Sequence, residues 1–309
     1  MEHYVTLFDS VFLPQGIALH TSLERHAGPY VLWILCIDDI TYDALRRLRL
    51  ANVRLMRLAE VETPELLRVK RERSRIEYYW TLTPFAPRFV FDADPAAARV
   101  TYVDADLWFR QSPAPIFREF ERSRKQVLIT EHAYAPEYDQ TAMSGRFCVQ
   151  FLTFTRGGET VRKWWEERCI EWCFERYEDG KFGDQKYLDD WPDRFGDTVH
   201  VLQRTEWTCA PWNATVSPHE QALFFHFHGL RLLANDRVTI GNYRVTPTLI
   251  ERIYSPYLDC LASAIRALRG IGFEPRPQQR RDLVFMLKHE VLKLLGRRRP
   301  DVVMPMKAL

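Results

Sequence analysis

The sequence predicts an α/β fold in which a mixed, mostly parallel sheet is flanked by helices. Short apolar segments that suit buried strands alternate with helical segments within about the first sixty residues. This alternation favours parallel strands with helical crossovers, because a tight hairpin cannot join a parallel pair. The 309 residues also exceed what one hydrophobic core usually serves, which predicts one large domain with an appendage, or two domains.

The composition is that of an ordinary globular protein, with 46% hydrophobic and 27% charged residues and a net charge of +2. This near-neutral balance argues against a dedicated nucleic-acid binder, which would carry a strong basic excess. No apolar run reaches the roughly 18 residues of a membrane-spanning helix, and the start MEHYVTLFD has no signal-peptide pattern, so we expect a cytoplasmic protein. The six cysteines include no CxxC pair, which predicts buried free thiols.

The first half of the chain supplies the expected parallel strands. Residues 3–8 (HYVTLF), 30–37 (YVLWILCI) and 53–58 predict strands, with helices after the first two. Pro14 suits the first turn of its helix, where the missing N–H costs nothing. Residues 75–90 predict a helix that Pro84 and Pro87 start, kink or break.

The second half continues the pattern and then changes. We expect strands at 98–107, 125–130 and 147–154, and shorter ones at 198–202 and 223–227. Between them, residues 160–177 predict an amphipathic helix whose aromatic stripe faces the core. After a helix at 247–268 and a linker at 274–280, a last helix is expected at 282–295. The predicted division is a domain at 1–245 and a helical extension at 246–309.

The segment TYVDADLWF places two carboxylates, Asp104 and Asp106, where an apolar strand ends. If the strand continues through them, both side chains point the same way, because strand side chains alternate. Open α/β sheets bind ligands at the carboxyl ends of their central parallel strands. A divalent cation bound there would remove the repulsion between the two carboxylates. The pair alone is weak evidence, since such pairs also arise by chance.

Two further segments carry groups of the same chemistry. ALFFHFHGL places His226 and His228 near a strand end, and imidazole with carboxylate suits manganese or another first-row metal better than calcium. A histidine satisfied by backbone hydrogen bonds is the alternative. KFGDQKYLDDWP opens a short helix with Asp184 and Gln185, where simple helix capping by Asp184 is the alternative.

Taken in order, Asp104-Ala105-Asp106, Gly183-Asp184-Gln185 and His226-Phe227-His228-Gly229 resemble the motifs of the metal-dependent glycosyltransferases with the Rossmann-like GT-A fold. The chain is most similar to the retaining family that contains glycogenin and the bacterial lipopolysaccharide galactosyltransferases. VTLFDSVFLPQGIALHTSLERH also resembles the first strand and helix of that family, so the resemblance covers roughly residues 3–235.

This resemblance implies that Asp104, Asp106 and His226 bind Mn²⁺ or Mg²⁺, which bridges the diphosphate of a nucleotide sugar, with a UDP sugar expected. Asp184 would hydrogen-bond hydroxyls of the donor sugar, and Gln185 would lie close to the anomeric carbon. The full set of donor-binding positions that we assign is Leu7, Phe8, Asp9, Arg75 (with Arg73 as the alternative), Asp104, Ala105, Asp106, Trp212, Asn213, His228 and Gly229. A buried core role is the alternative for Trp212.

The sequence departs from the family at two places. After Phe147 the family has an Asn-Ala-Gly step that touches the donor sugar, whereas this chain has Cys148, Val149 and Gln150, so the donor sugar stays open. The family's Lys-Pro-Trp after the late histidine is absent, and Arg231 is the candidate to replace the phosphate contact of that lysine.

A metal on the diphosphate stabilises the negative charge of the leaving group, so no separate acid is needed to protonate it. The sequence agrees with this, because it shows no evident acid/base pair. The resemblance implies retention of configuration by front-face attack, since Gln185 is a poor nucleophile, with Asp184 as a nucleophile the alternative. We expect a saccharide or lipid-linked acceptor, as in surface-polysaccharide or glycoconjugate synthesis. Two other functions stay open: a metallohydrolase using His226, His228, Asp104 and Asp106, and a non-catalytic nucleotide-sugar-binding protein.

The last predicted helix has an apolar face beside Lys288, Lys293 and the basic run at 297–299. Such helices lie on anionic membrane surfaces, which would suit a lipid-linked acceptor at the inner face of the membrane. Packing against the catalytic domain or a second subunit is the alternative.

Overall fold

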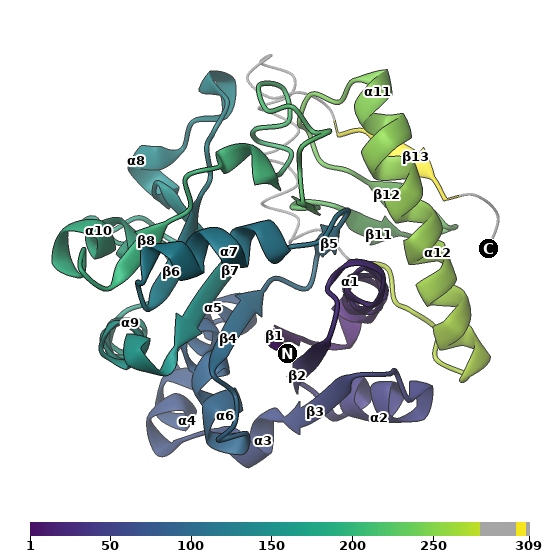
Figure 1. Cartoon of the computed structure of the whole chain (residues 1–309). Helices are drawn as coiled ribbons and strands as arrows, with labels where there is room; N and C mark the ends of the chain where they lie inside the picture. Colours follow the sequence, from purple (N-terminus) through teal and green to yellow (C-terminus); the bar gives the residue numbers. More distant parts are fainter. Residues whose placement is uncertain (279–300, 307–309) are drawn as a thin grey trace.

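The computed structural model describes residues 1–278 and 301–306, so the last helix predicted at 282–295 lies outside the described residues. At its centre is a seven-stranded sheet with the order β3-β2-β1-β4-β7-β6-β8 (Figure 1). Neighbouring strands are parallel except where β7 pairs with β4 and β6, so the predicted mostly parallel sheet is confirmed. Its strands are β1 (Glu2–Phe8), β2 (Tyr30–Cys36), β3 (Val53–Arg57), β4 (Arg99–Val103), β6 (Val127–Glu131), β7 (Phe147–Thr155) and β8 (Val199–Val201).

Helices cover both faces of this sheet. Along β1, Val5 lies in one hydrophobic core and its neighbour Tyr4 in the other, because strand side chains alternate between faces. Helices α4, α5, α6 and α9 close the first core, and α1, α2 and α7 close the second. The α-helices are α1 (Leu13–His26), α2 (Asp39–Leu48), α3 (Leu58–Val61), α4 (Pro64–Lys70), α5 (Arg75–Leu82), α6 (Ala86–Ala93), α7 (Ala114–Ser123), α8 (Thr141–Ser144), α9 (Glu159–Glu171), α10 (Trp191–Arg194), α11 (Pro247–Leu249) and α12 (Ser255–Gly270).

Two predicted helices differ from the structure at their ends. The helix expected at 75–90 is split into α5 and α6 by a 3-10 turn that contains Pro84, as the prolines predicted. The helix expected at 160–177 ends at Glu171, because Trp172 adopts an extended conformation. The Arg73 guanidinium donates to the carbonyls of Ile170 and Cys173, which satisfies backbone groups at this early end.

A second, smaller sheet joins segments that are far apart in the sequence. It has the order β5-β10-β9, with β5 (Leu107–Phe109) antiparallel to β10 (Phe224–His226) and β9 (Thr208–Cys209) parallel to β10. Since β5 follows β4 after a short turn, this sheet extends from the carboxyl end of β4 in the central sheet. It therefore brings the late histidines to the edge of the sheet where ligands bind in α/β folds.

The chain after residue 245 packs onto the rest of the described structure. Helix α12 shares a hydrophobic cluster with Trp108 and Phe227, and the ring of Tyr257 stacks on Phe227 with centroids 3.6 Å apart. A third sheet, β11 (Arg231–Leu233), β12 (Arg237–Thr239) and β13 (Val303–Pro305), lies beside it. The division of the chain at residue 245 stays a prediction.

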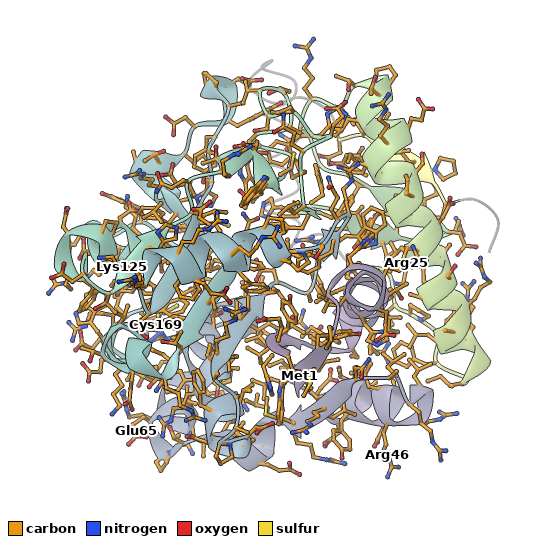
Figure 2. The ribbon with its side chains drawn as sticks, viewed as in Figure 1. Met1, Arg25, Arg46, Glu65, Lys125 and Cys169 are labelled. Atoms are coloured by element: carbon orange, nitrogen blue, oxygen red, sulfur yellow. The ribbon has the colours of Figure 1, made fainter. Side chains whose placement is uncertain are left out.

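The side chains follow the burial that the composition predicts. All six cysteines are buried and free, which confirms that expectation. Charged side chains such as Arg46 and Glu65 lie at the outer edge of the view in Figure 2, while Cys169 lies in the first core. Within residues 1–278 and 301–306, no helix combines the length and the apolar character needed to cross a membrane.

Candidate active site

The two neighbouring carboxylates lie in the turn between β4 and β5. Strand β4 ends at Val103, and the Leu107 amide donates to the Asp104 carbonyl at 3.1 Å, which closes the turn. The prediction that the strand continues through Asp104 and Asp106 is therefore wrong, because the chain leaves the central sheet here to pair β5 with β10. Both side chains nevertheless face the same imidazole.

That imidazole belongs to His226, which β10 places opposite Leu107. Its Nε2 lies 3.0 Å from Asp106 Oδ1 and 3.6 Å from Asp104 Oδ2. One ligand atom from each of the three residues lies within 4.8 Å of the others. Two carboxylate oxygens and one imidazole nitrogen form a donor set that fits Mn²⁺ or another first-row divalent cation, so these residues suit a metal.

The three groups titrate together. Burial disfavours the imidazolium of His226, but the charge of Asp106 and its hydrogen bond outweigh burial and raise the pKa of His226 well above its ordinary value. Burial also disfavours the Asp106 carboxylate, yet the His226 charge and hydrogen bond lower the pKa of Asp106 to about 2. Burial raises the pKa of Asp104 to about 6 despite the opposing charge of His226. A proton on His226 thus offsets the charge of Asp106 and only part of the charge of the pair, and a bound cation would replace that proton.

A third carboxylate, Asp184, is buried and only partly satisfied. Its side chain is 3% exposed, and its Oδ2 has no hydrogen-bond partner among the described residues. Burial, with a contribution from the charge of Asp104, raises the pKa of Asp184 to about 7. The short 3-10 helix that follows, Lys186–Asp190, has no side-chain cap at Gln185, while hydrogen bonds from the Thr83 side chain and the Gln185 backbone lower the pKa of Asp184 against the effect of burial. Gln185, half-buried, stands at the start of this helix.

The end of β1 and the start of α5 form the expected nucleotide side of the site. Leu7 and Phe8 are buried there, and Asp9 follows them at 5% exposure. Arg75 reaches Asp9 with Nη1 3.5 Å from Oδ2, so these two candidates lie together. Arg73, the alternative, is buried instead against the end of α9 and does not belong to this group.

The loop after β9 has a mainly structural role. The buried Trp212 donates from Nε1 to the His132 carbonyl at 2.8 Å. The side-chain amide of Asn213 is fully buried and is already paired with three backbone groups, those of Ala210, His132 and Thr208. The prediction that Asn213 contacts the donor is therefore not favoured, because its polar atoms already hold the loop in place.

The remaining candidates surround the histidines. Trp212 contacts the rings of His226 and His228 edge-on, with centroids 5.3 and 5.5 Å apart, so it is both a buried residue and a wall of the site. His228 is exposed, and Gly229 has a φ of +80°, a conformation that favours glycine. Ala105 is buried in the turn between the two aspartates.

Two tyrosines at the site were missed by sequence reasoning. The buried Tyr102 donates from its hydroxyl to Asp104 Oδ1 at 2.9 Å, and Tyr79 donates to Asp9 Oδ2 at 2.9 Å. The position of Tyr102, two residues before Asp104 on one strand face, was the available signal for the first. The second contact spans seventy residues, and no local pattern indicates it.

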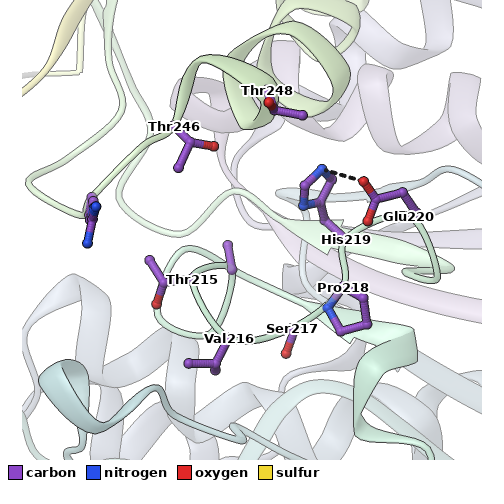
Figure 3. Close-up of a pocket in the computed structure, with 10 residues that line it drawn as sticks. Thr215, Val216, Ser217, Pro218, His219, Glu220, Thr246 and Thr248 are labelled. Carbon is purple, nitrogen blue, oxygen red and sulfur yellow. Dashed lines mark ion pairs between the residues drawn. The ribbon is translucent and has the colours of Figure 1, made fainter.

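A pocket of about 590 Å³ lies between the loop 214–220 and residues 244–248 (Figure 3). The two segments that form it start beside Trp212 and Tyr243, whose rings both contact His228. The polar and charged residues of its lining are Thr215, Ser217, His219, Glu220, Arg244, Thr246 and Thr248. We refer to it as the hydroxyl-lined pocket.

Comparison with solved structures identifies the fold of the chain. No family model matches the chain. The galactosyltransferase LgtC, solved with donor and acceptor sugar analogues, superposes with a TM-score of 0.53 at 13% identity, covering 84% of this chain and 95% of that one. The chain has the GT-A fold. The apo structure of mouse xyloside xylosyltransferase 1 gives a TM-score of 0.50 at 14% identity over 74% of this chain and 98% of that one.

The chain is also similar to YfnF, an uncharacterized protein of Bacillus subtilis (strain 168). The two are 28% identical over 291 residues, which cover 88% of this chain and 95% of YfnF. At this coverage the similarity includes Asp104, Asp106, Asp184 and His226 and extends past residue 245.

Proposed function

We propose that the protein is a metal-dependent glycosyltransferase that moves a sugar from a nucleotide diphosphate donor, expected to be a UDP sugar, to a saccharide or lipid-linked acceptor. The observation that carries the proposal is the convergence of Asp104, Asp106 and His226 at the carboxyl end of β4. The GT-A fold and the resemblance to the retaining glycogenin and lipopolysaccharide galactosyltransferase family support it.

Each group near the metal site has a task in this reaction. A divalent cation held by the Asp-Asp-His set would stabilise the negative charge that develops on the departing diphosphate. Arg231 adds a positive charge near that point, since its charge helps to lower the pKa of Asp106 after the larger effects of burial and His226. Arg231 also lies over the ring of Phe12, next to the nucleotide side of the site, as a replacement for the family's lysine would.

The donor sugar is held by the buried carboxylate. Asp184 offers an unpartnered Oδ2 that can accept a hydrogen bond from a sugar hydroxyl. Gln185 lies next in the chain and would face the anomeric carbon, which favours front-face transfer with retention because an amide is a poor nucleophile. Asp9 and Arg75 would line the base and ribose.

The hydroxyl-lined pocket is the candidate acceptor site. Its two segments follow Trp212 and Tyr243, whose rings both contact His228, and this connection to the donor side supports the assignment. Its threonine and serine hydroxyls and its charged groups suit a polar saccharide. A role in surface-polysaccharide or glycoconjugate synthesis, with the C-terminal basic segment at the inner face of the membrane, belongs to the same proposal.

The experiment is a donor screen. The protein is incubated with a panel of nucleotide sugars, with and without Mn²⁺, and the release of nucleoside diphosphate is measured. Release that requires the metal and is lost in Asp106→Ala supports the transferase. Metal-dependent hydrolysis of esters or amides without a nucleotide would support a metallohydrolase instead, and tight nucleotide binding without turnover would support a binding protein.

A further inference from the structure

One residue of the central sheet contacts two of the three candidate metal ligands. Gln150 lies in the middle of β7 and is fully buried. Its side-chain Oε1 lies 2.9 Å from Nδ1 of His226, and its backbone carbonyl accepts from the Asp104 amide at 3.1 Å. The strand next to β4 thus holds both the histidine and one of the aspartates.

The contact at Nδ1 decides which nitrogen of His226 can bind a metal. A neutral imidazole carries one proton, and a metal on Nε2 requires that proton to be on Nδ1. The Nδ1–H then needs an acceptor, and the amide oxygen of Gln150 is in place to accept it. On the other side of the ring, Nε2 faces Asp104 and Asp106, where the cation would lie.

The orientation of the glutamine amide is consistent with this role. With Oε1 on His226, the amide nitrogen Nε2 of Gln150 has no partner among the described residues. The reversed amide would donate to Nδ1, which would leave the ring proton on Nε2 and block the metal. Of the two orientations, the one seen here, in which a buried donor is left unpaired, is therefore the one compatible with a metal on Nε2.

We propose that Gln150 is a positioning residue that holds His226 in the Nδ1–H tautomer and so makes its Nε2 a ligand for the divalent metal. This inference rests on the proposed metal site. The resembling family usually has glycine in the Asn-Ala-Gly-like step at this place, and glycine has no side chain that could accept a hydrogen bond from His226. Outer hydrogen-bond partners of metal-binding histidines typically contribute 10- to 100-fold in affinity.

The test measures Mn²⁺ affinity of the full chain by electron paramagnetic resonance of free Mn²⁺. Gln150→Leu removes the acceptor, and we expect Mn²⁺ affinity to fall about 10- to 100-fold. Gln150→Glu keeps an acceptor at the same reach, and its affinity should stay within about threefold of the wild type or rise. The matched control is Thr153→Val, a buried position on the same strand whose hydroxyl pairs with that of Thr101; its affinity should not change.

Gln150→Leu with wild-type affinity, or a loss in Gln150→Glu equal to that in Gln150→Leu, overturns the inference. If Gln150→Leu does not fold by circular dichroism, Gln150→Asn, whose shorter side chain withdraws the acceptor, takes its place with the same expectation. Failure of the proposed function is separate: it appears as a wild type without Mn²⁺ affinity, or as Asp106→Ala that binds Mn²⁺ normally.

Discussion

The carboxylates of Asp106 and Asp184 differ in whether an imidazole lies beside them. Asp106 is opposed by His226, and the partner more than compensates burial, so its pKa is lowered to about 2. Asp184 lacks such a partner, and burial raises its pKa to about 7. The same side chain is thus charged in one place and half-protonated near neutral pH in the other. His226 thus supplies a positive charge at the proposed metal site, whereas at the proposed sugar site burial has the largest effect on Asp184, whose Oδ2 has no hydrogen-bond partner among the described residues.

The largest expected effect is on the metal side. Asp106→Ala removes the strongest partner of His226 and one ligand, and we expect nucleoside diphosphate release to fall at least about 1,000-fold with loss of Mn²⁺ binding. Steady-state assays at saturating Mn²⁺ and the same electron paramagnetic resonance titration measure both. Asp189→Ala, whose carboxylate pairs with Lys186 away from the metal ligands, is the control. Unchanged nucleoside diphosphate release in Asp106→Ala would contradict a role of this carboxylate in the reaction.

On the sugar side, the effect should be smaller and confined to turnover. Asp184→Asn keeps the shape but replaces a carboxylate oxygen, and we expect kcat to fall about 100-fold while Mn²⁺ affinity stays at the wild-type value. Kinetics with the best donor of the screen give kcat and KM separately. A loss of Mn²⁺ affinity equal to that in Asp106→Ala would mean that the two sides are not distinct.

The free energy of unfolding should also reveal the raised pKa of Asp184, in the absence of substrate. The pKa of Asp184 is about 7 in the folded state against an ordinary 3.8, so between these values the folded state binds more protons than the unfolded state. The free energy of unfolding therefore decreases as the pH rises from about 4 to about 7. In Asp184→Asn this decrease should shrink by roughly 2–4 kcal/mol. Urea unfolding of the metal-free protein at pH 5 and pH 8 measures it, and equal decreases in both proteins would contradict the assignment.

The smallest effect is expected at Asp9, whose carboxylate is partnered by Tyr79 and Arg75. Tyr79→Phe removes one hydrogen bond, whose net contribution is typically about 0.5–1.5 kcal/mol. We expect the KM for the donor to rise about 3- to 10-fold with kcat unchanged. Tyr42→Phe, on α2 outside the site, serves as the control. A fall in kcat with constant KM would place Tyr79 at the reacting centre instead of the nucleotide.

The sequence predicted the parts of this structure that local patterns determine. The apolar segments became β1, β2 and β4 because buried strands of such a sheet are apolar on both faces, whereas β3 is a partly exposed edge strand. The early end of α9 was not predictable from local pattern, because the group that satisfies its carbonyls, Arg73, lies about a hundred residues earlier in the chain. The ordered motifs brought Asp104, Asp106 and His226 together correctly. The partners of these residues, Tyr102 and Gln150, depend on how neighbouring strands lie side by side, which no motif specifies.

The most direct measurement is anomalous diffraction from a crystal soaked with Mn²⁺ and UDP. The account predicts one manganese peak, about 2.0–2.3 Å from an oxygen of Asp104, an oxygen of Asp106 and Nε2 of His226, with the diphosphate on its open side. Manganese bound elsewhere, or UDP bound with no cation at these three residues, would contradict the assignment of the metal site.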